Sequence, residues 1–137
     1  MAYRLIEHTA DMGLEVRGGS LEELFGEAAR GFRELMFGHA TGDSLLSTHL
    51  QVSGQEVGEL LVNWLNDILY LFEVRGIYPV SFEVQAVNDT SARGLVRGEP
   101  FDAGRHPVER VVKAVTYHQL EVKRTAAEWR ARVYVDL

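Results

Sequence analysis

The strongest constraint on the fold is a pattern of apolar residues at helical spacing that occurs twice in the chain. In its first copy, "SLEELFGEAARGFRELMFG" at residues 20–38, apolar side chains fall on one helical face and charged ones on the other. Ser20 and Glu23 have the spacing of an N-terminal capping box, and Gly38 fits the residue just past a helix end. An amphipathic helix is therefore predicted between Ser20 and Gly38.

The second copy is "SGQEVGELLVNWLNDILYLFEVRG", at residues 53–76. Ser53 and Glu56 predict another capping box, and the pattern ends at Gly76. Its apolar stripe is wide and consists of Val57, Leu60, Leu61, Trp64, Leu65, Ile68, Leu69 and Phe72. Such a stripe could face a partner or another copy, but a core face is favoured because burial is the main use of so apolar a helix.

Short runs of period two surround these helices and predict strands. They read "YRLI", "GLEVRG", "LLSTHLQVSG", "YPVSFEVQAV", "TSARGLVRG", "VVKAVTYHQLEVKR" and "WRARVYVDL". Two helices against a largely antiparallel sheet give an α+β two-layer fold. No linker is long enough to divide the chain, so residues 1–137 are predicted to form a single domain.

Composition excludes several classes of function. Cysteine is absent, which rules out thiolate metal sites and a cysteine nucleophile. The start "MAYRLIEH" lacks a basic segment leading into an apolar region, and no apolar run approaches the roughly 18 residues of a membrane span, so a cytosolic protein is expected. With a net charge of −6, a broad basic surface is not expected, and RNA would be held by a partner.

The turn "EHTADMG" places His8 three residues before Asp11. At this spacing the aspartate could orient the histidine, or both could approach one metal ion. Aspartate in such a turn also commonly bonds to local backbone, and Thr9 could do the same. The spacing alone leaves both interpretations open.

The last strand, "WRARVYVDL", places Asp136 on the face opposite its apolar residues. An exposed ion pair with an arginine is one interpretation. The alternative is a cation site, because the carboxylates of Asp136 and of the terminal residue Leu137 are expected to lie close together. Oxygen groups from Asp11, Asp136 and Leu137 would suit Ca²⁺ or Mg²⁺ better than zinc.

The segment "KAVTYH" and the charged loop that precedes it remain open from the pattern alone. If the segment is extended throughout, Lys113 and His118 lie on opposite faces and can share a target only if a bulge or a turn intervenes. His118 is then either a hydrogen-bonded structural histidine or a ligand. Asp102, Arg105 and His106 are predicted to lie in a solvated loop, with partner contact as the alternative.

Familiar enzyme motifs are missing from the sequence: it has no nucleophile elbow, no phosphate loop with its lysine, no GxGxxG and no HExxH. Taken in order, however, "HTADMGLEVRG", "LEELFGEAARGFRELMF", "LLVNWLNDILYLFE", "GRHPVERVVKAVTYHQLEV" and "WRARVYVDL" closely resemble the archease family over essentially the whole chain. Met12 stands where that family usually has isoleucine, which is a conservative apolar change.

The resemblance implies an accessory protein that activates the RtcB-type tRNA-splicing RNA ligase. Such a protein promotes guanylylation and multiple turnover of the ligase, broadens its NTP use, and meets tRNA only through it, with no nucleotide cofactor of its own. The resemblance also implies a divalent metal site at Asp11, Asp136 and Leu137, with Ca²⁺ as the expected ion and Mg²⁺ or Mn²⁺ as functional alternatives. His8, Lys113 and His118 are expected to contribute to activation or partner contact, and the protein itself is not expected to be catalytic.

Two other classes of function remain open at this point. The first is a metal-dependent hydrolase that uses His8, Asp11 and His118 itself. The second is a chaperone-like binding module, for which an exposed loop from Glu99 to His106 would matter more than the carboxylates.

Overall fold

The computed structural model describes residues 2–7 and 12–137. Within these ranges the elements follow in the order β1 (Tyr3–Glu7), β2 (Met12–Gly18), α1 (Leu21–Phe37), β3 (Leu46–Ser53), α2 (Val57–Glu73), β4 (Ile77–Val87), β5 (Ser91–Pro100), β6 (Ala114–Arg124) and β7 (Trp129–Asp136). Every predicted helix and strand run corresponds to one of these elements.

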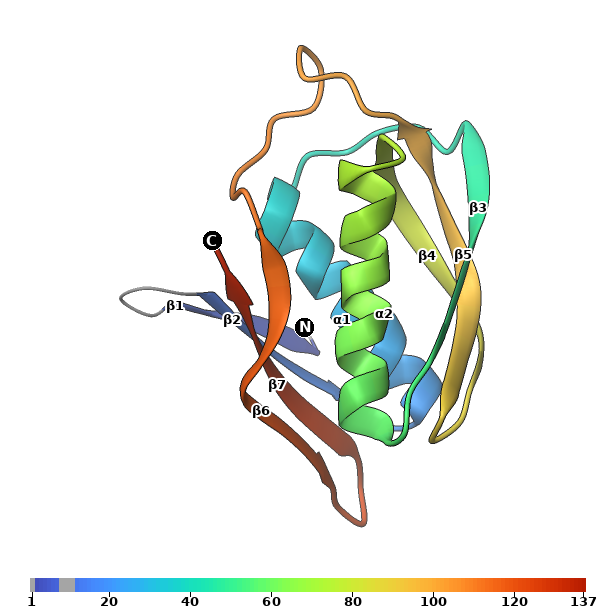
Figure 1. Cartoon of the computed structure of the whole chain (residues 1–137), viewed down its shortest axis with the longest axis vertical. Coiled ribbons are helices and arrows are strands. Elements are labelled where there is room, and N and C mark those ends of the chain that lie inside the picture. Colours follow the sequence, from blue (N-terminus) through green and yellow to red (C-terminus); the bar gives the residue numbers. More distant parts are fainter. Residues whose placement is uncertain (1, 8–11) are drawn as a thin grey trace.

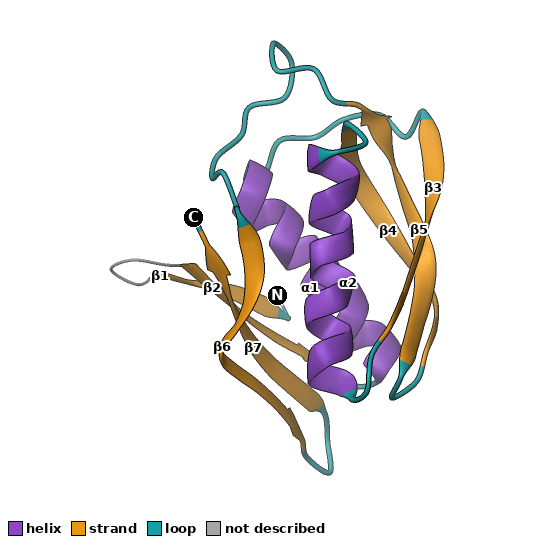
Figure 2. Cartoon of the chain, viewed as in Figure 1, coloured by secondary structure: helices purple, strands orange, loops and turns teal. Residues whose placement is uncertain are grey.

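The strands divide between two antiparallel sheets, with the helices between them (Figures 1 and 2). One sheet has the order β1-β2-β7-β6 and the other β3-β5-β4. The α+β class with two helices on antiparallel strands is confirmed. The two-layer arrangement needs correction, because α1 contacts β2 and β4 while α2 contacts β6 and β3, so the helix layer is covered on both sides.

Helix α1 begins as the sequence predicts. The Glu23 N–H donates to Ser20 Oγ at 3.1 Å, and the Glu23 carboxylate accepts from the Gly19 N–H at 2.8 Å. The helix ends at Gly38, whose φ of 65° is the left-handed region that glycine reaches without strain. The capping prediction at both ends is confirmed.

Helix α2 begins later than the Ser53 capping box predicts. Its N-cap is Glu56, whose carboxylate accepts from the N–H groups of Gly58 and Glu59 at 2.8 and 2.7 Å. The predicted box is wrong because Ser53 still pairs with Ser91 in the β3–β5 ladder.

The apolar stripe of α2 is core. Leu60, Trp64 and Leu65 are fully buried, and the same cluster takes in Leu14 from β2 and Leu50 from β3. The interpretation of this stripe as a partner groove is thereby excluded. In the described ranges no helix combines the length and apolarity needed to cross a membrane.

The loop after β5 departs from its expected exposure. Glu99 and His106 are only 1% and 2% exposed, and Glu99 Oε1 lies 2.6 Å from His106 Nε2. The Asp102 N–H donates to His106 Nδ1 at 2.9 Å, so the proton is assigned to Nε2, which donates to Glu99. The prediction of a solvated loop is wrong for His106, because the turn stacks its imidazole on Tyr78 at 3.9 Å. It holds for Asp102 and Arg105, which are exposed.

The surroundings of Glu99 predict that the fold loses stability at low pH. The Asp43 N–H, 2.5 Å from its carboxylate, holds the pKa of Glu99 below the usual value, helped by His106 and Arg105 and opposed by burial. Because the pKa of Glu99 is lower in the folded state than in the unfolded state, the ionised carboxylate stabilises the fold at pH values above the unfolded-state pKa of about 4.3. This contribution is lost as the pH falls through the lower folded-state pKa.

We therefore expect urea midpoints to fall more between pH 5 and pH 3 for the native sequence than for Glu99→Gln. Asp89→Asn, at an exposed carboxylate in the β4–β5 turn, should keep the native pH dependence. Parallel pH profiles for the native protein and Glu99→Gln would contradict the assignment.

Candidate functional site

The candidate site lies where β2, β7 and β6 end together. Met12 pairs with Val135 and Ala114 pairs with Asp136, while the Lys113 N–H donates to the Asp136 carbonyl at 2.8 Å. These ladders bring the start of β2 and the segment before β6 to the last residues of the chain. Figure 1 shows the C-terminus at this end, near the start of β6.

A bulge in β6 decides where His118 lies. Thr116 pairs with Tyr134 and Glu121 pairs with Arg132, so five steps along β6 match two steps along β7. The strand is therefore not extended throughout, and Gln119 within the bulge has a positive φ of 50°. The bulge resolves the open choice, because His118 lies within it and strict alternation from Lys113 no longer applies.

The bulge holds His118 near Tyr134. Thr116 Oγ1 donates to the Tyr134 carbonyl at 3.1 Å and accepts from the His118 N–H at 3.2 Å. The His118 ring is exposed and lies 6.2 Å from the Tyr134 ring, edge to face. Glycine at position 13 makes room for the Tyr134 ring, because a Cβ at position 13 would lie 2.7 Å from Tyr134 Cε1.

Asn66 anchors this end of β6 to α2, and the sequence reasoning missed it. Its side-chain NH₂ donates to the Val115 carbonyl at 3.0 Å, and its Oδ1 accepts from the Val115 N–H at 2.9 Å. A polar, half-buried residue beside the apolar stripe of α2 was the available signal. Asn66 fixes the backbone two residues after Lys113.

Asp136 and Leu137 supply the described part of the predicted metal site. Asp136 is exposed, as the strand alternation predicts, and Leu137 is 44% exposed. Among residues 2–7 and 12–137, no hydrogen bond or ion pair involves the Asp136 carboxylate, so the alternative of an arginine partner finds no support there. His8 and Asp11 lie outside the described residues; Asp11 directly precedes Met12 in the sequence.

The donor chemistry of these residues fits a hard cation only in part. The Asp136 carboxylate and an oxygen of Leu137 suit Ca²⁺ or Mg²⁺, but Ca²⁺ takes six to eight oxygen ligands. In the described ranges no group of three or more His, Asp or Glu side chains could hold a metal ion. A site here therefore needs Asp11, backbone oxygens or water in addition to Asp136 and Leu137.

The fold and this strand end define a small α+β protein that presents exposed carboxylate and imidazole groups where three strands end. The chain matches the model of the archease protein family over residues 3–137. It belongs to the archease family.

Known proteins agree with this membership over nearly full length. Protein archease of Methanopyrus kandleri is 36% identical, with all of both chains covered, and that of Methanosarcina mazei is 34% identical, with 98% of this chain and 95% of the relative covered. The solution structure of protein 1598 of Methanobacterium thermoautotrophicum has a TM-score of 0.85 at 27% identity, covering 99% of each chain. A crystal structure from Thermotoga maritima, described as an archease and possible chaperone, shares the fold with a TM-score of 0.65 at 23% identity.

Proposed function

We propose that the protein is a cytoplasmic accessory factor that activates an RtcB-type tRNA-splicing RNA ligase. It promotes guanylylation and multiple turnover of the ligase and broadens its NTP use, while the catalytic groups belong to the ligase. The observation that carries this proposal is membership of the archease family over residues 3–137. The protein associates with tRNA only indirectly, by binding the ligase that holds the tRNA.

The proposed working edge is the strand end formed by β2, β7 and β6. Asp11, Asp136 and a backbone or terminal oxygen of Leu137 hold a divalent metal there, with Ca²⁺, Mg²⁺ or Mn²⁺ suited to oxygen ligands. Lys113 and His118 are exposed at the same end and, with His8, contact the ligase. This edge docks near the guanylylation site and positions the metal or the nucleotide phosphates.

Replacing Asp136 with alanine tests the proposal directly. Multiple-turnover ligation by the ligase, measured with the variant as activator, is expected to fall by about tenfold or more, since even outer-shell partners of metal sites are worth about 10- to 100-fold. Asp11→Ala should behave alike. Asp89→Ala, at an exposed aspartate in the β4–β5 turn, is the matched control and should activate normally. Undiminished stimulation by Asp136→Ala would refute the proposal.

A chaperone-like module is the second candidate, because the Thermotoga maritima relative of the same fold is described as a possible chaperone. It predicts suppression of aggregation of a client protein that survives Asp136→Ala and is lost on changing exposed loop residues such as Arg105. Turnover of phosphoesters by the isolated protein with added metal would instead favour the hydrolase with His8, Asp11 and His118.

A further inference from the structure

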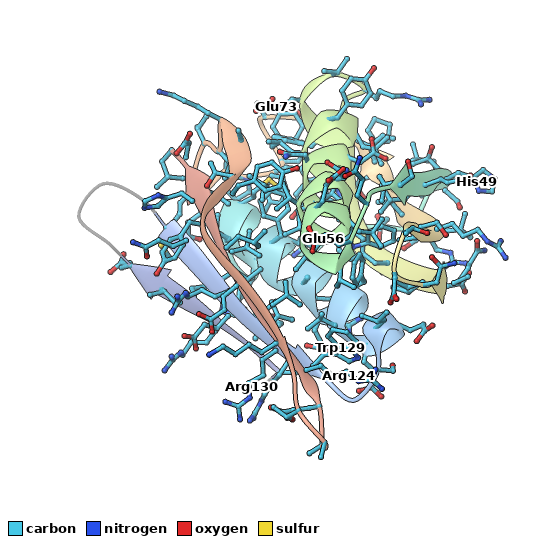
Figure 3. The ribbon with its side chains drawn as sticks, turned by 60° about the horizontal axis from the view of Figure 1, so that its bottom comes forward. His49, Glu56, Glu73, Arg124, Trp129 and Arg130 are labelled. Atoms are coloured by element: carbon cyan, nitrogen blue, oxygen red, sulfur yellow. The ribbon has the colours of Figure 1, made fainter. Side chains whose placement is uncertain are left out.

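Cations gather on the outer face of the four-stranded sheet, far more than the net charge of −6 would predict. The register turns seven charged side chains away from the helices in the half of this sheet nearest Trp129: Arg4, Glu15, Arg17, Glu121, Lys123, Arg130 and Arg132. Five of the seven are cationic. In Figure 3, Arg130 points away from the helices while its neighbour Trp129 points toward them.

One row across this face consists only of cations. Arg17 of β2 lies directly opposite Arg130 of β7, which lies opposite Lys123 of β6. Like charges at directly opposite positions destabilise an antiparallel pair. Arg130 and Lys123 are each relieved by an acid two residues before them in the sequence, Glu128 and Glu121. In the described ranges the Arg17 side chain has no hydrogen bond or ion pair.

The neighbouring row alternates in charge and still leaves one donor unused. Arg4 pairs with Glu15, and Arg132 Nη2 lies 3.3 Å from Glu121 Oε2. Arg132 Nε, however, is buried and has no hydrogen-bond partner within the described part of the chain. An unsatisfied buried donor on a charged group is costly to the fold.

A pocket of about 420 Å³ lies over the two rows. It is lined by side chains of Arg4, Arg17, Arg130 and Arg132 together with Glu15 and Glu121. Its size is that of small-ligand sites, which span roughly 300–1,000 Å³. Guanidinium groups bind phosphate through paired hydrogen bonds, and four of them from three strands provide for more than one phosphate group.

We propose that this pocket binds a small ligand with two or more adjacent phosphate groups, such as tripolyphosphate or a nucleoside triphosphate. Arg17 and Arg130 neutralise the phosphates, with the guanidinium groups of Arg4 and Arg132 beside them. The pocket lies open at the surface, but Glu15 and Glu121 interrupt its positive lining, which disfavours a long nucleic-acid strand. The site is separate from the carboxylates of the proposed working edge and does not depend on the function proposed for them.

Titration calorimetry with tripolyphosphate, guanosine triphosphate and a short single-stranded RNA tests the proposal. We expect Arg17→Gln and Arg130→Gln each to weaken tripolyphosphate binding by about tenfold or more, since a hydrogen bond to a charged group is worth at least that factor. Arg93→Gln is the matched control, because Arg93 is also an exposed strand arginine but lies on β5 of the other sheet. The Arg93→Gln variant should bind tripolyphosphate with the affinity of the native protein.

The melting temperature of the free protein separates a ligand role from a structural one. Arg17→Gln removes one of two opposed cations, so the unliganded variant should melt no lower than the native protein. Tighter binding of the nucleotide than of tripolyphosphate supports the proposal and identifies a nucleotide as the source of the phosphates. Absence of binding, binding of RNA alone, an equal loss in Arg93→Gln, or a lowered melting temperature in Arg17→Gln would each overturn it.

Discussion

Replacing Trp64 with alanine is expected to lower the free energy of unfolding by about 4 kcal/mol, within the range for large-to-small changes at buried tryptophan. Trp64 is fully buried in α2, and its ring meets the Phe25 ring of α1 edge to face at 5.7 Å. Its Nε1–H also donates to the Phe25 carbonyl at 3.1 Å. The ring thus joins the two helices, and a cavity between them could close only if the helices moved.

Trp129→Ala is the matched control for this effect. Trp129 lies at the start of β7, is partly exposed, and has the Arg124 guanidinium over its ring at 5.3 Å (Figure 3). Its loss should cost less than half as much as that of Trp64, because less of its surface leaves water on folding. Urea unfolding followed by far-UV circular dichroism gives both values. Equal losses for the two variants would contradict the central role of Trp64.

Gly98→Ala is expected to lower the free energy of unfolding by about 4 kcal/mol or more. Losses of this size come from a few mechanisms, of which overpacking is one. Gly98 lies in β5 opposite Pro79, beside an irregularity in the β4–β5 ladder. A Cβ at this position would overlap the Tyr78 carbonyl oxygen, well inside the 3.0 Å that real Cβ contacts respect.

The Tyr78 backbone cannot easily retreat from such a contact. Its ring is held between Phe37, at 4.9 Å, and His106, at 3.9 Å, and its hydroxyl accepts from Arg33 Nη2 at 2.9 Å. The added methyl group must therefore separate β4 from β5. Because typical domains are stable by about 5–15 kcal/mol, a substantial unfolded fraction is expected.

Gly104→Ala is the control for Gly98→Ala. Gly104 lies in the exposed loop after β5, and a Cβ there would meet Asp102 Oδ1 at 3.4 Å, an ordinary contact. Its unfolding free energy, from the same urea titration, should stay within about 0.5 kcal/mol of the native value. Similar losses at both glycines would show that the Tyr78 carbonyl is not the cause.

Much of the fold could be predicted because local patterns decide it. Ser20 and Gly38 bound α1 through capping that acts within one turn of the helix. Alternation in β7 placed Asp136 away from the core, since successive strand residues face opposite sides. These features depend on neighbours within a few residues, and the sequence displays such neighbours directly.

The rest could not be predicted because it depends on residues far apart in the chain. Ser53 has the pattern of a helix cap, yet its pairing with Ser91 keeps it in β3. The burial of His106 depends on Tyr78 and Glu99, and no local pattern distinguishes it from the exposed Arg105. Sequence reasoning therefore predicted a solvated loop where the tertiary structure has a buried hydrogen bond between His106 and Glu99.

The candidate site shows the same division. The sequence by itself predicted that Asp136 faces away from the core at the end of a strand, and its motifs identified the family. Only the tertiary structure decided that Lys113 adjoins Asp136 and that a bulge holds His118 beside Tyr134. Only the tertiary structure shows that Arg17 of β2 lies directly opposite Arg130 of β7. The physical reason is strand pairing: register between distant segments is set by the packing of both faces, which a single segment does not encode.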